Sequence, residues 1–128
     1  MQSSWQPKKI PIERALDKYT DIVEDLIPHM PKDIKHTKKK KLLDLDLVLY
    51  ELLYTAKEFP NERQMALRKF KNKFFLMQTI LRKAHNKKFI VTKAYTQTFE
   101  PASNIERQLT GWIKTLPASE SVTADGEC

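Results

Sequence analysis

The chain has 128 residues, of which 41% are hydrophobic and 30% are charged, and it contains two glycines and one cysteine. This composition is typical of one soluble globular domain whose core needs neither disulfides nor metal. It excludes a disulfide-stapled scaffold, and so few glycines disfavour folds rich in tight turns or built on a glycine-rich phosphate loop.

The ends of the chain are polar. The opening MQSSWQPKK lacks the apolar centre of a secretory signal, and no stretch reaches the roughly 18 apolar residues of a membrane span. We therefore expect a cytoplasmic protein with no membrane contact. Without apolar periodicity, residues 1–10 and 117–128 are expected to be flexible, which leaves a domain of residues 11–116. Cys128 has no second thiol to pair with and is expected to be a solvated side chain.

The formal net charge of +7 is unevenly distributed. The segment from Lys32 to Lys93 holds 17 basic and 6 acidic residues, a net +11, so the rest of the chain is net −4. An anionic partner should bind this middle segment. The alternative is that these lysines are simply solvated helix surface.

A first helix is predicted from Pro11 to about Pro28 or Met30, because apolar residues recur at spacings of three and four. Its exposed side is acidic, with Asp17, Asp21, Glu24 and Asp25. Two prolines in the following PHMPKDIKH predict a connector over residues 28–36.

A second helix is predicted over Thr37–Phe59, with Thr37 as N-cap, Pro60 as its stop and four lysines in the first turn, where the helix dipole disfavours cations. It carries two apolar arcs. One consists of Leu42, Leu45, Leu49, Leu52, Leu53 and Ala56, and the other of Leu43, Leu47, Tyr50 and Tyr54. A peripheral helix needs only one such stripe, so the second arc is expected to contact something else, for example another copy of the chain.

A third helix is predicted to start at Asn61, a cap paired with Gln64, and to end near His85 and Asn86. Its core stripe is Ala66, Phe70, Phe74, Met77, Leu81 and Ala84. Away from that stripe lies a cationic stripe with an aromatic residue in it, formed by Gln64, Arg68, Lys71, Phe75 and Arg82.

A fourth helix is predicted from a cap at Thr92 to Leu116, kinked at Pro101 because the apolar phase continues through the proline. A break is the alternative, with a fresh capping box over Ser103–Glu106. Gly111 in mid-helix predicts close approach of another backbone. Four helices with short connectors predict an all-α, antiparallel up-down-up-down four-helix bundle.

Catalytic residues are not evident. His29, His36 and His85 lie in connectors or at a helix end without metal-ligand spacing, so neither a metal nor a cofactor is expected. The acidic side of the first helix could hold an acid and base pair, but a solvated face explains it more simply. We expect no enzyme; a small hydrolase or nuclease is the remaining alternative.

Binding of single-stranded nucleic acid is the function that the charges favour. Phosphates recruit lysine and arginine, and unpaired bases stack on aromatic rings. Phe75 fits an oligomer contact equally well. The candidate residues are Lys38, Lys39, Lys40 and Lys41 together with Arg68, Lys71, Phe75, Arg82 and Lys83.

The segment IERQLTGWIK, residues 105–114, resembles the C-terminal helix of the accessory variability determinant (Avd) proteins of diversity-generating retroelements. These belong to a wider group of small four-helix bundles that includes proteins encoded in intervening sequences of 23S ribosomal RNA genes. The match extends over Tyr19, Pro31-Lys32, Leu52-Leu53, Ala56-Lys57, Leu81-Arg82 and Tyr95. The chain departs from the family pattern at Pro101 and at Glu106 and Thr110, where small residues are common.

The resemblance implies a basic homopentameric barrel that binds the element's reverse transcriptase and its template RNA or cDNA. Such a protein supports mutagenic cDNA synthesis without catalysing it. The expected oligomer contacts are Leu43, Leu47, Tyr50, Tyr54, Gly111 and Trp112. The alternative is a structural bundle of the intervening-sequence kind, with an unassigned RNA or protein partner.

Overall fold

The computed structural model describes residues 10–117, and for 33–35 the backbone alone. In that range the chain is all-helical and forms a four-helix bundle, as the sequence predicts. The helices are α2 (Pro11–Leu26), α3 (Lys32–Glu58), α4 (Arg63–Asn86) and a fourth in two pieces, α5 (Thr92–Thr96) and α6 (Phe99–Lys114). Short 3-10 turns η1 (Ile27–His29) and η2 (Pro60–Glu62) precede α3 and α4. The predictions for residues 1–9 and 118–128, Cys128 included, lie outside the described range.

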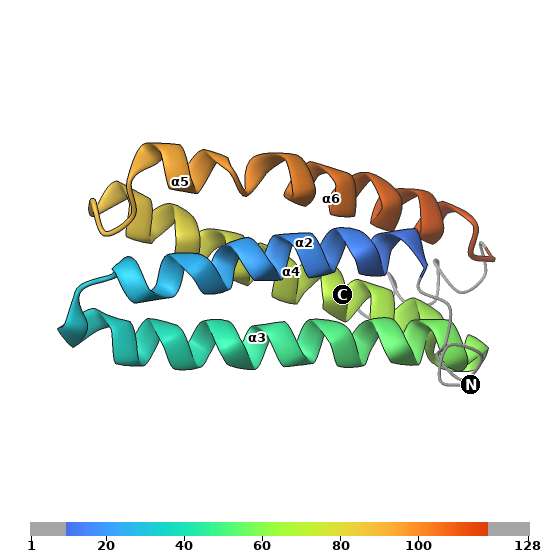
Figure 1. The fold of residues 1–128 in the computed structure, drawn as a ribbon. Coiled ribbons are helices and arrows are strands. Elements are labelled where there is room, and N and C mark those ends of the chain that lie inside the picture. The colour runs from blue at the N-terminus through green and yellow to red at the C-terminus, as the bar shows by residue number, and fades with distance from the viewer. Residues whose placement is uncertain (1–9, 118–128) are drawn as a thin grey trace, which may run out of the picture.

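The long helices lie lengthwise beside one another (Figure 1). Successive connections lie at alternate ends, with η1 and the α4–α5 turn at one end and η2 at the other (Figure 1). The most extensive contacts join α3 to α4 and α2 to α6. The first and last helices of the domain therefore pack together, and the two central helices form the second pair.

One apolar core runs between the helices. Each contributes fully buried side chains, such as Leu16 from α2, Leu49 from α3, Phe74 from α4 and Ile105 from α6. All six residues of the core stripe predicted for the third helix are buried, which confirms that part of the periodicity argument. Among the residues that the structure describes, no helix is long and apolar enough to cross a membrane.

The start of α3 differs from the prediction. The helix begins at Lys32, directly after Pro31, so Thr37 lies in its second turn and is not the N-cap. A proline restricts the residue before it but leaves the chain after it free to turn into a helix. Lys38–Lys41 consequently lie inside the helix, and the predicted conflict with the dipole of the first turn does not arise. Similarly, η2 follows Phe59, and α4 starts without a side-chain cap from Asn61.

The fourth helix breaks at Gln97 and Thr98, so the prediction of one kinked helix is wrong. Pro101 causes the break one turn upstream, because it has no N–H for the carbonyl of Gln97 and its ring would clash with that carbonyl. Thr98 is buried, and its hydroxyl donates to the Tyr95 carbonyl at 2.8 Å. Pro101 then lies in the first turn of α6, where no intrahelical donor is required. The alternative break at Ser103 is also wrong, because α6 continues through it.

Gly111 makes no close contact within the described chain. An added Cβ there would have no atom of the described chain within 4 Å, apart from those of its own helix and its sequence neighbours. The sequence predicted that another backbone would pass close to Gly111, but no backbone of the described chain does so.

Candidate nucleic-acid interface

The four lysines of α3 distribute positive charge around the helix. Consecutive helical residues are about 100° apart, so Lys38–Lys41 cannot share one face. Lys38 is half-buried, whereas Lys39, Lys40 and Lys41 are exposed. The last two line an open depression of about 440 Å³ with His36, Thr37 and Asp44.

Helix α4 carries seven Lys or Arg residues and no Asp or Glu. Lys71, Phe75 and Arg82 share one stripe and are exposed, the phenyl ring to 64%. Arg68 belongs to the same stripe but is half-buried and interacts with another group of the chain. Lys83 is exposed about 100° further round, on the next stripe. The exposed aromatic ring therefore has a cation one turn before it and another two turns after it.

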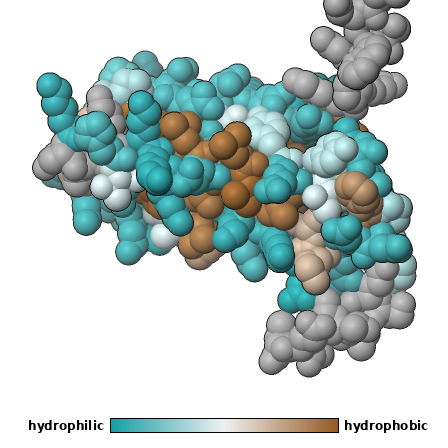
Figure 2. Space-filling model, turned by 90° about the horizontal axis from the view of Figure 1, so that it is seen from below, coloured by the Kyte–Doolittle hydropathy of each residue, from teal (hydrophilic) through white to brown (hydrophobic). Residues whose placement is uncertain are grey.

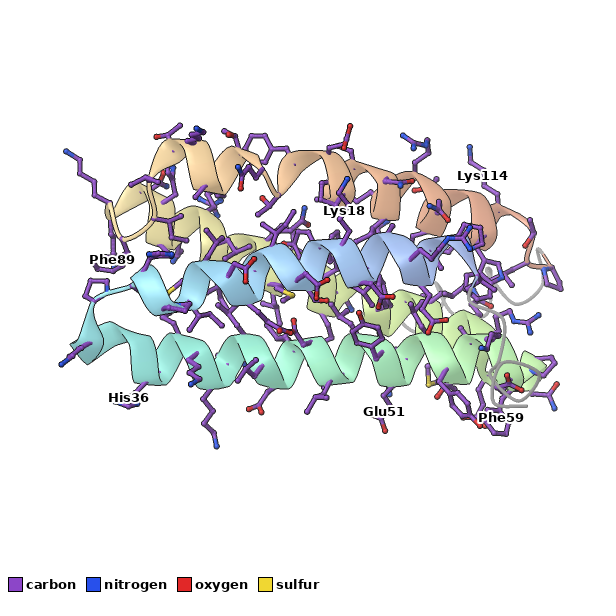
Figure 3. The ribbon with its side chains drawn as sticks, in the orientation of Figure 1. Lys18, His36, Glu51, Phe59, Phe89 and Lys114 are labelled. Atoms are coloured by element: carbon purple, nitrogen blue, oxygen red, sulfur yellow. The ribbon has the colours of Figure 1, made fainter. Side chains whose placement is uncertain are left out.

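The start of α3 and the end of α4 lie at the same end of the bundle, where Figure 3 labels His36 and Phe89. Lys38–Lys41 and Arg82 are thereby brought to one end, together with Lys87 and Lys88, which the sequence analysis did not include among the candidates. The order of the helices could have identified them, because an up-and-down connection places the residues after α4 beside the beginning of α3.

The backbone fixes Lys87 and Lys88 in a tight turn. The Phe89 amide donates to the Ala84 carbonyl and the Lys88 amide to the His85 carbonyl, both at 2.9 Å. Lys88 has a positive φ of 66°. This is a Schellman ending with lysine where glycine is usual. The cationic side chains follow the C-terminus of α4, where the helix dipole favours positive charge.

The predicted oligomer residues do not form one surface. Leu47 and Tyr54 are 71% and 58% exposed, and Leu43 is half-buried. The Tyr50 hydroxyl, in contrast, is bound within the chain: it donates to the Asp17 carboxylate at 2.5 Å and lies 3.2 Å from the Thr20 hydroxyl. Burial and this bond to Asp17 both raise the Tyr50 pKa.

Trp112 also makes a contact within its own chain. It is half-buried, and the Arg63 guanidinium lies 5.9 Å from its ring centroid. Arg63 in turn donates to the carbonyls of Ala56 and Lys57 at the end of α3. The Arg63 guanidinium therefore satisfies carbonyl groups at the C-terminus of α3 and is not part of the candidate interface.

Asp46 is a buried carboxyl group between α2 and α3. It is 6% exposed, and neither carboxylate oxygen has a hydrogen-bond partner within the described structure. Burial, which is the largest cause, and the nearby carboxyl groups of Glu24 and Asp21 together raise the Asp46 pKa to about 7. Asp46 was missed in the sequence, although helical spacing places it on the same arc as Leu42, Leu49 and Leu53, which are all buried.

Among the side chains that the structure describes, no set of three or more His, Cys, Asp or Glu residues is arranged to hold a metal ion. Neither a family model, nor a curated protein, nor a solved structure matches the chain.

Proposed function

We propose that the chain is a non-catalytic accessory protein of a diversity-generating retroelement. In this proposal it is an antiparallel up-down-up-down bundle that forms a homo-oligomer, a pentamer by resemblance. It binds the element's reverse transcriptase and its RNA or cDNA, and the polymerase supplies the chemistry. The family and the reverse transcriptase partner are inferred from the resemblance of residues 105–114. The nucleic-acid ligand is inferred from the distribution of charge.

The observation that carries the nucleic-acid part is the basic end of the bundle. Cations of α3 and of the end of α4 lie at this end, and Phe75 with Lys71 continues the surface along α4. Neutralising phosphates releases condensed counterions, which supplies affinity without reading sequence. An exposed ring adds stacking with an unpaired base. The arrangement therefore suits a flexible single strand that is positioned for another enzyme.

Fluorescence anisotropy with a labelled single-stranded RNA tests this part. We expect the logarithm of the affinity to fall linearly with the logarithm of salt concentration, with a slope of about −0.7 for each phosphate neutralised. The double variant Lys71→Glu/Arg82→Glu should bind at least about tenfold more weakly, and Phe75→Ala should lose about 1–3 kcal/mol of stacking. Lys114→Glu, at the opposite end of the bundle, is the matched control (Figure 3). Binding that does not change with salt would refute the proposed mode.

Co-purification with the product of the neighbouring gene tests the retroelement part. We expect a reverse transcriptase to be retained, and a pair of variable and template repeats to lie nearby. A gene inside a ribosomal RNA insertion, with no reverse transcriptase beside it, would instead support the intervening-sequence kind of bundle.

A further inference from the structure

The bundle carries an apolar surface on the side where α3 lies. Figure 2 shows apolar side chains gathered in a band across this face, with hydrophilic groups around them. On α3, Leu47 and Tyr54 are the large exposed apolar residues, and they are two helical turns apart on one arc. Scattered exposed leucines are ordinary, but residues aligned on one arc offer a partner a continuous contact.

Acidic residues surround the centre of this arc. Asp44 and Glu51 are exposed one turn before and one turn after Leu47, and Figure 3 shows Glu51 pointing away from the bundle. On α2, the neighbouring helix, Asp21 and Glu24 are also exposed. Overall α2 holds five acidic and two basic residues. We call Leu47, Tyr54 and these four carboxylates the acidic-apolar face.

Helix α4 has a second stripe with the opposite character. It consists of Met65, Lys69, Asn72, Leu76 and Lys83, at spacings of three, four and seven residues, and all five are exposed. Each of them directly follows a position of the stripe that contains Lys71, Phe75 and Arg82, and so lies about 100° further round the helix. Leu76 has a lysine two turns before it and another two turns after it. We call these five residues the basic-apolar stripe.

We propose that the basic-apolar stripe of one copy of this chain binds the acidic-apolar face of the next copy. Leu76 and Met65 would pack on Leu47 and Tyr54, and the two lysines would lie among the carboxylates. The occupant is a second copy because one chain carries both complementary surfaces, although its overall charge of +7 disfavours self-association. The inference rests on the homo-oligomer of the proposed function and specifies its contact.

A contact between two different surfaces can repeat head to tail around a ring. A two-fold contact of α3 with α3 would instead bring like-charged carboxylates together. The stripe with Lys71, Phe75 and Arg82 stays outside the contact. Each subunit of the ring therefore keeps these three residues exposed, and Lys83 is the candidate nucleic-acid residue that enters the contact.

A mixing experiment with two variants tests the contact. Leu47→Arg places a cation on the acidic-apolar face, and Leu76→Glu places an anion on the basic-apolar stripe. Each variant alone should sediment as a single chain of 15.1 kDa, because each has lost one of the two surfaces. An equimolar mixture should form dimers of one copy of each variant, because the intact stripe of the first variant can bind the intact face of the second while the other two surfaces are altered. Ser103→Glu, at an exposed position of α6 outside both surfaces, is the control and should assemble like the unmodified chain.

Three results would overturn the inference: an unmodified chain that stays single at 50 µM, a mixture that stays monomeric, or normal assembly of Leu76→Glu alone. Circular dichroism of each variant establishes that it is folded. RNA binding by the monomeric variants is measured in parallel. Binding without assembly would refute this contact alone, whereas assembly without binding would refute the nucleic-acid function alone.

Discussion

Replacing the buried Asp46 by asparagine should stabilise the protein at neutral and alkaline pH. Asparagine keeps the size and shape of the side chain but carries no charge. The carboxyl group is 6% exposed and has no hydrogen-bond partner within the described structure, so its ionised form is the unfavourable one. Asp25→Asn, at an exposed position of α2 outside the acidic-apolar face, is the matched control.

The pKa of Asp46 gives the size and the sign of the effect. It rises from an ordinary value of 3.8 to about 7 in the folded protein. Below about pH 3 the group is protonated in both states, and its contribution to stability is fully present. Between pH 4 and 7 the folded state binds more protons than the unfolded one, so stability falls as pH rises. A shift of about three pH units corresponds to at most about 4 kcal/mol. We expect about half of this, because the neighbouring Glu24 and Asp21 are in contact with water.

Urea unfolding at pH 4 and pH 8, at one fixed protein concentration, measures this difference. Asp46→Asn should match the unmodified protein at pH 4 and exceed it by about 2 kcal/mol at pH 8, a midpoint shift of about 1 M urea. Asp25→Asn should change little at either pH. Equal effects of Asp46→Asn at both pH values, or a loss of stability at pH 8, would refute the reasoning.

Two further substitutions test individual contacts by thermal unfolding. Lys88→Gly should stabilise the bundle by about 0.5–1 kcal/mol, because glycine adopts a positive φ without steric cost. Lys87→Gly, whose φ is −88°, should not stabilise, and a stabilisation there would contradict the explanation. Tyr50→Phe should destabilise by about 1 kcal/mol through loss of the hydroxyl bonds to Asp17 and Thr20. Tyr54→Phe serves as its control, and an equal loss in both variants would show that the bonds are not responsible.

The bundle was predictable because its core follows from periodicity. The stripe from Ala66 to Ala84 is buried throughout, and α4 ends at Asn86 as expected. Helix starts were less predictable, since Pro31 ends one segment and permits the next to begin at once. The break at Gln97 follows from Pro101, but the continuous apolar phase concealed it. The apolar pattern predicts which face of a helix is buried. It does not predict whether the backbone hydrogen bonds of that helix continue without a break.

The candidate site was partly predictable. Charge density identified the lysines of α3 and the stripe of α4, but spacing alone could not show that Arg68 is already engaged or that Tyr50 bonds to Asp17. The bond between Tyr50 and Asp17 joins two different helices, and the spacing within one helix does not predict such a contact. The burial of Asp46 depends on the same packing of α2 against α3.

The pairing of α2 with α6 has a consequence for biosynthesis. The α3–α4 hairpin joins neighbours in the sequence and can form as soon as both have left the ribosome. The apolar side of α2, with Leu16 and Val23, has to wait until the last helix has been made. During that interval the apolar side of α2 lacks its main partner, and an exposed amphipathic segment of this kind is what chaperones protect.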